Sequence, residues 1–593
     1  MRPTLPLAAA LLAAACASSG GAPAARQAAA TPDAAAARVT ALADTFVAAY
    51  LDRFPEVVTF NGIPGGRHDR LSDNSLDALR RWEAREDAWL AEVRRTDPAP
   101  LAGRTEWVTY GILREALEAS VGVRVCRGEL WGVSQIAGWQ INLPQLAGTQ
   151  PVGTAELRAQ ALARWRTFPR FVDTEIANLR EGVRQGYTVP RHNVELVIEQ
   201  VDGLLSPPTR ESPFYAMAAQ DSAPGAEAFR ADVERLVAAD INPALARYRD
   251  YLRREYLPVA RSTIAVSAIP NGAACYRALV RQFATVDVPP DEIHRVGLQQ
   301  MAKIEGEMAE IARRSFGTSD VRAVLDRLKT DPQYTFKSRE EVIAYSRAAV
   351  ERAQRAAPRW FGILPKARVV IERYPEYRER SASGEYWPPA EDGSRPGTFY
   401  ISTYEPTKRS RSGPESVAFH ETVPGHHLQG AIALERGSAT HPIARYLSNS
   451  GYAEGWALYA ERLADEMGLF SSDLDRMGML SEQAYRAARL VIDPGIHSLG
   501  WTREQAIEYM ASHTTAPRDE VISEIDRYII WPGQATSYML GMLEIRRLRD
   551  QAERELGPKF DIRAFHDRIL ENGAVPLPLL RDAVGRWVER TPQ

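Results

Sequence analysis

Residues 414–429 read Pro-Glu-Ser-Val-Ala-Phe-His420-Glu421-Thr-Val-Pro424-Gly-His426-His427-Leu-Gln. Three of the ten histidines in the chain fall within these eight central positions, and a glutamate follows the first of them. Neutral imidazole is a common zinc ligand, and two imidazoles with one carboxylate leave a fourth position open for water. A polar surface helix or a packed histidine pair would explain neither the clustering nor the helix breaker inside it. The stretch therefore predicts a metal site.

The spacing of the histidines departs from the usual helical zinc motif, in which they lie four residues apart. His420 and His426 are six residues apart, or about 240° on a regular helix, and His427 lies about 10.5 Å further along the axis than His420. Pro424 cannot donate a hydrogen bond to the carbonyl of residue 420, so the helix must bulge or break there. Two looped-out residues would then bring His426 to the second ligand position. We favour His426 and leave His427 open; the other ring would support a ligand or face the substrate.

A third ligand is expected on the helix that begins near residue 451. Glu454 lies about 120° from the centre of the apolar stripe of that helix, which favours a solvated carboxylate. Apolar residues on its other sides instead favour a buried carboxylate, which needs a partner such as a metal. The residues alone leave both readings open.

Four motifs together resemble a known bacterial family. They are the His420–Gln429 run, Tyr-Ala-Glu454-Gly-Trp-Ala, Asp493-Pro-Gly-Ile-His497 and Trp531-Pro-Gly-Gln534-Ala-Thr-Ser-Tyr538. They look like the family labelled domain of unknown function 885, which is related to helical zinc peptidases such as carboxypeptidase Taq, the oligoendopeptidases and angiotensin-converting enzyme. The resemblance covers nearly all of residues 38–590. It implies a mainly α, two-lobed body around a deep cleft with a small β-sheet at the cleft edge, and catalytic helices at about 413–590 within a domain spanning 38–593.

The resemblance also implies roles for single residues. His420, His426 and Glu454 would bind Zn²⁺, and Glu421 would be the general base. The candidates for stabilising the oxyanion are Tyr528, Tyr538 and His497, although core packing explains each of them equally well. The residues expected to support the ligands or touch substrate are His427, Glu461, Arg489 and Gln534. Arg489 could bind a substrate carboxylate, but a structural ion pair is the simpler explanation.

These residues predict a zinc-dependent peptidase that hydrolyses short peptides with a metal-activated water and Glu421 as base. One alternative is a zinc amidohydrolase acting on a small non-peptide amide. Another is a non-catalytic peptide-binding lipoprotein, against which Glu421 argues because a structural site would close the fourth position with a ligand.

The N-terminal sequence predicts export. Arg2 precedes an apolar stretch of small residues that is too short to span a bilayer and ends at Cys16. We expect residues 1–15 to be a signal peptide and Cys16 to carry a lipid, which would be the sole membrane attachment. Residues 16–37 are rich in Ala, Gly, Ser and Pro and should form a flexible tether. Ala17 favours the outer membrane, so the protein would face the periplasm or the cell surface.

Composition and patterning bound the remaining possibilities. The chain of 593 residues carries a net charge of −3, which gives no general attraction to nucleic acid. Cys126 and Cys275 either pair in an oxidising compartment or stay as buried thiols.

Helical periodicity marks the segments 37–52, 75–95, 155–185, 225–256, 290–315 and 339–357. Two strands are expected at 367–372 and 397–402, with a Pro/Gly/Ser-rich loop between them and with 397–402 free to pair with an extended peptide.

Overall fold

The computed structural model describes residues 31–591 except for 64, 375–378, 380–383, 390–394, 437–439 and 448. The predicted signal peptide, the lipid attachment at Cys16 and most of the predicted tether lie outside the described residues. Helices dominate the described chain, and one small sheet interrupts them. The predicted mainly α fold with a small β-sheet is thus confirmed, while the two-lobed body around a deep cleft stays a prediction.

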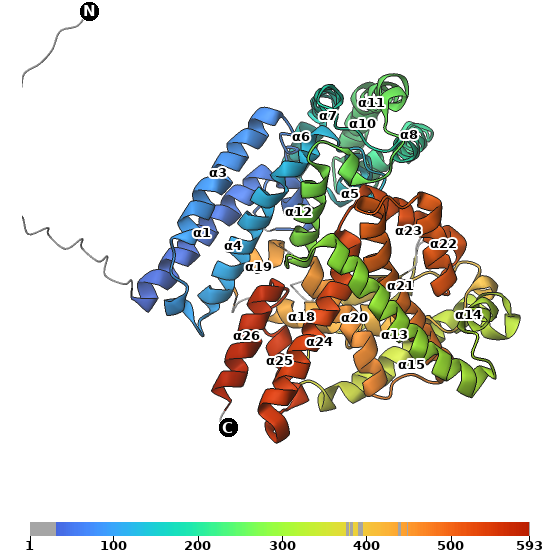
Figure 1. Ribbon diagram of the computed structural model, residues 1–593. Helices are drawn as coiled ribbons and strands as arrows, with labels where there is room; N and C mark the ends of the chain where they lie inside the picture. The colour runs from blue at the N-terminus through green and yellow to red at the C-terminus, as the bar shows by residue number, and fades with distance from the viewer. Residues whose placement is uncertain are drawn as a thin grey trace, which may run out of the picture.

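The first half of the chain forms two groups of helices, which Figure 1 shows in blue and in teal to green. The first group holds α1 (Pro32–Arg53), α2 (Pro55–Phe60), α3 (Leu76–Arg94) and α4 (Thr105–Val123). The second group holds α5 (Trp139–Thr149), α6 (Ala155–Arg166), α7 (Phe168–Arg184), α8 (Arg191–Leu205), α9 (Ala216–Ala219), α10 (Ala226–Leu236) and α11 (Asn242–Tyr251). The predicted helix at 155–185 is divided at Thr167, and α10 and α11 are joined by a π-helical turn.

Helix α1 begins earlier than the sequence suggested. The Thr31 side chain accepts a hydrogen bond from the N–H of Ala34, and Pro32 occupies the first turn, both of which favour a helix start. Ala35 and Ala36 are buried, so assigning residues 32–37 to the tether was wrong. Within the described residues, α1 is also the one helix that is long and apolar enough to cross a membrane, although it packs on α4 and α3 as a core helix does.

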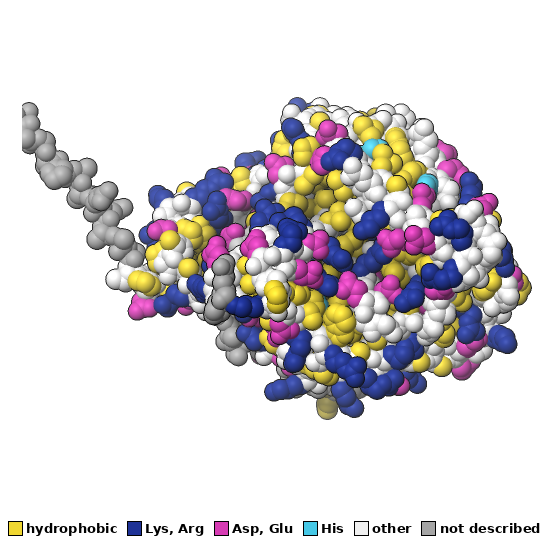
Figure 2. Space-filling view, turned by 60° about the horizontal axis from the view of Figure 1, so that its bottom comes forward, with side chains coloured by type: hydrophobic (Ala, Val, Ile, Leu, Met, Phe, Trp, Pro, Cys, Tyr) yellow, Lys and Arg dark blue, Asp and Glu magenta, His cyan; other side chains and the backbone are white. Residues whose placement is uncertain are grey.

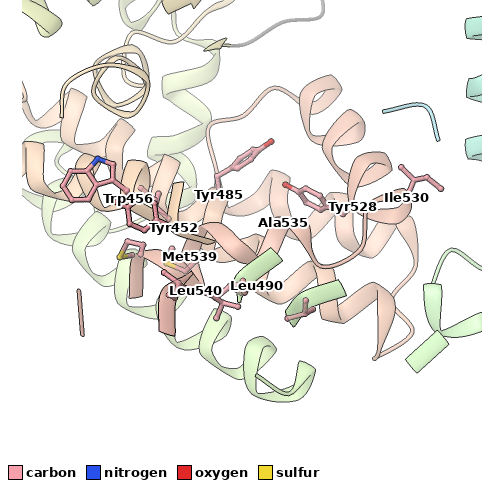
Figure 3. Packing of buried hydrophobic residues seen from close by; sticks show 14 of the residues in the cluster. Tyr452, Trp456, Tyr485, Leu490, Tyr528, Ile530, Ala535, Met539 and Leu540 are labelled. Carbon is pink, nitrogen blue, oxygen red and sulfur yellow. The ribbon is translucent and has the colours of Figure 1, made fainter. Parts of the chain in front are cut away.

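The second half of the chain is built on long helices that pack along one another in pairs. The helices before the sheet are α12 (Gly272–Ala284), α13 (Pro290–Phe316), α14 (Val321–Thr330) and α15 (Arg339–Ala356). Those after it are α17 (Pro414–Glu421), α18 (His426–Glu435), α19 (Ile443–Tyr446), α20 (Ser450–Glu466), α21 (Asp473–His497), α22 (Arg503–His513), α23 (Arg518–Ile530), α24 (Ser537–Leu556), α25 (Ile562–Leu570) and α26 (Leu577–Arg590). Helix α13 packs along α21, and α20 packs along α24. Figure 3 shows the apolar side chains that α20, α21, α23 and α24 contribute to this core.

The sheet contains three strands in the order β1 (Val369–Arg373), β3 (Gly397–Ile401), β2 (Gly384–Trp387). Strands β1 and β3 confirm the two predicted strands, whereas β2 lies where a loop was expected. Tyr386 and Trp387 favour extended backbone, and β2 pairs antiparallel with β3. Because β3 is central, both of its edges are occupied, and the expectation that 397–402 could accept a peptide as a further strand was wrong.

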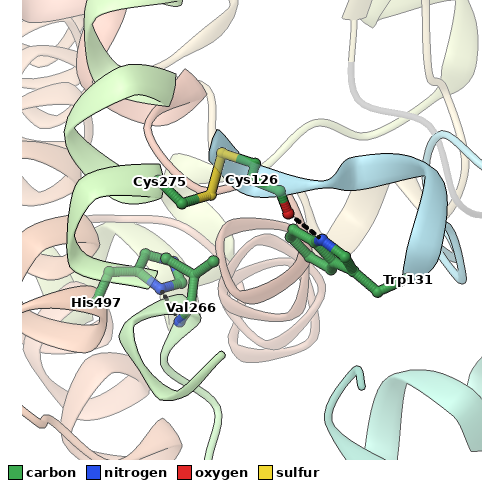
Figure 4. The surroundings of a disulfide bond; sticks show 5 residues. All are labelled: Cys126, Trp131, Val266, Cys275 and His497. Atoms are coloured by element: carbon green, nitrogen blue, oxygen red, sulfur yellow. Dashed lines mark hydrogen bonds between the residues drawn. A yellow bond between two sulfur atoms is a disulfide. The ribbon is translucent and has the colours of Figure 1, made fainter. Parts of the chain in front are cut away.

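A disulfide joins Cys126, at the end of a short 3-10 helix after α4, to Cys275 of α12 (Figure 4). The sequence left this pairing open. Trp131 donates a hydrogen bond to the Cys126 carbonyl, and both half-cystines are buried. On the surface, positive and negative side chains are interspersed over the face drawn in Figure 2.

Candidate metal centre

The chain breaks its helix between the first two histidines. Helix α17 begins at Pro414 and ends at Glu421, and α18 begins at His426. The Val423–Pro424 peptide bond is cis. A Cβ on Gly425 would lie 1.9 Å from the carbonyl oxygen of His420, so no larger residue fits at this position without movement. Trp456 of α20 donates a hydrogen bond to the Pro424 carbonyl at 3.0 Å, which ties the break to the next helix.

This break brings together the donor atoms of three residues from three helices. His420 Nε2 lies 3.7 Å from Glu454 Oε2, and His426 Nε2 lies 3.5 Å from the same oxygen. The two imidazole rings are nearly perpendicular at 85°, with their centroids 4.9 Å apart. All three donor atoms lie within 4.8 Å of one another, and among the described residues these side chains form the one such group that could hold a metal.

A buried carboxylate holds His420 from the other side of its ring. His420 Nδ1 donates to Glu461 Oε1 at 2.8 Å, and Gln483 Nε2 of α21 donates to the other oxygen at 2.9 Å. Because an ionised carboxylate only accepts hydrogen bonds, Nδ1 carries a proton, and Nε2 is the ring nitrogen left to bind a metal. Such carboxylate–histidine pairs orient ligands in known metal sites.

Charges in this group oppose the cost of burial. Burial lowers the pKa of His420, but the hydrogen bonds to Glu454 and Glu461 and the charge of Glu421 outweigh it and raise the pKa to about 9. Burial also raises the pKa of Glu454, but the two histidines hold it well below its usual value. The protein alone therefore balances the Glu454 carboxylate with protons on imidazole, and a bound cation would replace those protons.

His427 has a different set of contacts. Its Nε2 lies 3.0 Å from the Ala367 carbonyl oxygen, and its Nδ1 lies 2.9 Å from the Tyr386 hydroxyl. Nε2–H therefore donates to the carbonyl, and Nδ1 accepts from the tyrosine. The ring packs close to Gly397, where a Cβ would lie 2.6 Å from Nδ1. Both ring nitrogens are hydrogen-bonded to residues in or next to the sheet, so the geometry favours His426 as the ligand.

Glu421 is the last residue of α17 and is half-buried. Its charge acts on His420, the neighbouring residue in the chain. It thus stands beside the donor group without being part of it. This placement suits a group that exchanges a proton with a molecule bound at the site.

The two candidate tyrosines differ in environment. Tyr528 is fully buried, and its hydroxyl donates to Glu524 at 2.8 Å and accepts from Arg489 Nε at 2.8 Å. Tyr538 of α24 is partly exposed. Burial first, and then the charge of Glu454, raise the pKa of Tyr538, so its hydroxyl stays protonated at neutral pH and lies within the electrostatic reach of Glu454. Tyr538 is therefore the better placed of the two to donate a hydrogen bond near the donor group.

The structure does not bring His497 into this group. His497 Nδ1 accepts from the Val266 N–H at 3.0 Å, and Nε2 donates to the Tyr528 carbonyl at 3.0 Å, close to the disulfide (Figure 4). These contacts account for the ring as a buried structural group. Gln534 accepts from Arg527 at 2.6 Å and reaches Ser450 at the start of α20 at 3.4 Å, one turn before Glu454.

The donor set fits zinc. Tetrahedral coordination with bonds of about 2.0–2.2 Å sets neighbouring ligand atoms roughly 3.3–3.6 Å apart, and the distances of 3.5 and 3.7 Å are close to that. Two imidazoles and one carboxylate are also the ligand types that zinc takes in open, catalytic sites. The further support from Glu461 and Gln483 is what a fixed imidazole ligand requires.

Fold and site thus define a mainly helical protein with a three-residue candidate metal centre. The chain belongs to the family described as bacterial protein of unknown function (DUF885), whose model matches residues 55–584. A crystal structure of a "putative lipoprotein" from Colwellia psychrerythraea is similar, with 26% identity and a TM-score of 0.86 over 94% of this chain and 100% of that one. A "putative lipoprotein of unknown function" from Shewanella oneidensis shares the fold at 17% identity and a TM-score of 0.74, over 91% and 98% of the two chains. No curated protein matches the sequence.

Sequence reasoning missed two residues that shape the site. Gln483 lies on α21 and supports Glu461, but a lone glutamine on an apolar helix carries no signal of such a role. Tyr386 lies in the segment expected to be a loop and determines where His427 points. Recognising β2 as a strand would have indicated that Tyr386 faces a neighbouring element.

Proposed function

We propose that this protein is a zinc-dependent peptidase that hydrolyses short peptides. The observation that carries the proposal is the convergence of His420 Nε2, His426 Nε2 and Glu454 Oε2 with Glu421 directly after the first ligand. A site that served structure alone would close the fourth position with another side chain. The resemblance of the motifs to helical zinc peptidases agrees with this reading.

The residues of the chain divide the chemical work. Zinc bound here would supply Lewis acidity and lower the pKa of a bound water. Glu421 accepts the proton of the attacking water and passes it to the leaving amine. Tyr538 donates a hydrogen bond to the negative charge that develops on the carbonyl oxygen of the substrate. Glu461 and Gln483 hold His420 in one tautomer and one orientation throughout.

We further propose that the protein is exported and anchored by a lipid at Cys16, with the outer membrane as its destination. The N-terminal sequence supports this, and so does the Cys126–Cys275 disulfide, since disulfides persist in oxidising compartments. The two similar solved structures are each described as a "putative lipoprotein".

The test compares the wild-type protein with Glu421→Gln, both lacking residues 1–16. Metal content and hydrolysis of a mixed peptide library are measured for each. The proposal predicts one zinc per chain in both proteins, and peptide cleavage by the wild type alone. Zinc without peptide cleavage would favour the amidohydrolase or the non-catalytic peptide-binding lipoprotein, and absence of zinc would overturn the proposal.

A further inference from the structure

A second group of charged side chains lies on α21, the helix that supports the metal centre. Arg489 is 7% exposed at its side chain. Its Nε donates to the Tyr528 hydroxyl at 2.8 Å, and its Nη2 donates to Glu524 at 3.0 Å. The guanidinium carbon lies 4.1 Å from the centroid of the Tyr538 ring and 5.0 Å from that of Tyr485. Figure 3 shows Tyr485 and Tyr528 turned toward the same space.

One nitrogen of the Arg489 guanidinium makes no hydrogen bond within the described residues. Within the described part of the chain, Arg489 Nη1 is buried and has no hydrogen-bond partner, and the same is true of Nε of Arg486 one turn earlier. An unpaired buried donor is costly, and more so when it is charged. Two such donors on neighbouring turns of one helix are open to an acceptor that comes from outside the chain.

Carboxylates of the chain pair with the other nitrogens of these guanidinium groups. Glu524 accepts hydrogen bonds from Arg489, Arg527 and Tyr528, so one carboxylate serves two guanidinium groups. Arg486 is paired with Glu482 on its own helix. Glu461 and Glu520 also interact electrostatically with Arg486, so these arginines stand among at least as many carboxylates, and the case for an anion rests on the unpartnered donors.

This group is connected to the metal centre by α21 and α24. Gln483, Arg486 and Arg489 are spaced three residues apart and so share one face of α21. Gln483 holds Glu461, and Arg489 lies about 9 Å further along the axis. Tyr538, against which Arg489 stacks, is under the influence of the Glu454 charge.

We propose that Arg489, with Arg486 beside it, binds the free carboxylate at the C-terminal end of a peptide substrate. The planar guanidinium suits a carboxylate, which would accept hydrogen bonds from the unpartnered Nη1 and Nε atoms. The inference rests on the proposed peptidase function and deepens it. Substrates are then short peptides with an unblocked carboxyl end, cut near that end.

The test measures binding to zinc-loaded Glu421→Gln protein by calorimetry. The probes are an acetylated pentapeptide of alanine and phenylalanine as the free acid, and the same peptide as the C-terminal amide. We expect the acid to bind about 10- to 150-fold more tightly, the range for a charge-assisted hydrogen bond to a charged group. Adding Arg489→Gln should abolish this difference and leave the affinity for the amide unchanged, whereas Arg489→Lys should retain part of it.

The matched control is Arg549→Gln on α24, which removes an arginine that is 12% exposed at its side chain and is paired with Glu466, Glu553 and Tyr459. It should leave the preference for the acid intact. Equal binding of acid and amide, no binding of either, or equal loss of both in Arg489→Gln would each overturn the inference. Cleavage of amidated peptides as fast as free acids would keep the peptidase function and refute the role of Arg489. A preference for the acid in binding, without cleavage by the wild type, would keep the role of Arg489 and refute the peptidase function.

Discussion

Replacing Glu461 with glutamine should weaken zinc binding while leaving the fold intact. Glu461 is 1% exposed at its side chain, accepts from His420 Nδ1 at 2.8 Å and from Gln483 Nε2 at 2.9 Å. A glutamine can accept from His420 only by turning its NH₂ group toward the NH₂ group of Gln483. Gln483 cannot flip without losing its further bonds to the Leu458 carbonyl and to Arg462. The variant therefore loses a charge and leaves one mismatched donor pair.

The magnitude follows from the position of this carboxylate behind a ligand. Loss of such a partner typically costs 10–100-fold in metal affinity, or about 1.4–2.7 kcal/mol. Zinc affinity is measured by competition with a chromophoric chelator, and the circular dichroism spectrum checks folding. The matched control is Glu466→Gln on the same helix, where the carboxylate pairs with Arg546 and Arg549. The reasoning fails if folded Glu461→Gln binds zinc within twofold of the wild type, or if Glu466→Gln loses as much affinity.

Three further results are expected. His426→Ala should lose bound zinc while His427→Ala keeps one zinc per chain by metal analysis, because the nitrogens of His427 are bonded near the sheet; loss of zinc in His427→Ala alone would reverse the assignment. Replacing Cys126 and Cys275 by serine should lower the free energy of unfolding in urea by about 2–5 kcal/mol, since the bond closes a loop across 149 positions; an unchanged midpoint would contradict this. Burial lowers the pKa of His497 to about 3, so the folded protein keeps it neutral while the unfolded chain takes up a proton below about pH 6.5. Its contribution is present above pH 6.5 and falls by about 2 kcal/mol by pH 5; unfolding curves at pH 7 and pH 5 should show a smaller difference for His497→Gln, and an equal difference would refute the assignment.

The proline at position 424 made the break between α17 and α18 predictable from the sequence. Pro424 forbids a continuous helix after His420, and the structure ends α17 at Glu421 and starts α18 at His426. The same reasoning could not choose between the histidines, because the choice depends on Ala367 and Tyr386, which are 60 and 41 residues away in sequence. Contacts of that range are set by tertiary packing, on which periodicity carries no information.

The remaining differences have similar causes. Strand β2 was taken for a loop because prolines and glycines surround it, although its pairing with β3 outweighs their influence. The start of α1 was placed too late because alanine-rich sequence suits both a tether and a helix, and the cap at Thr31 decides between them. His497 resembled a catalytic residue by its motif, but burial and two backbone hydrogen bonds explain its presence.

The most direct test of the metal centre is an anomalous difference map from a crystal of zinc-loaded protein, with data collected on both sides of the zinc edge. The account predicts one strong peak about 2.0–2.2 Å from His420 Nε2, His426 Nε2 and a Glu454 oxygen, with Glu421 free beside it. A peak ligated by His427 in place of His426, or no peak at these three side chains, would contradict it.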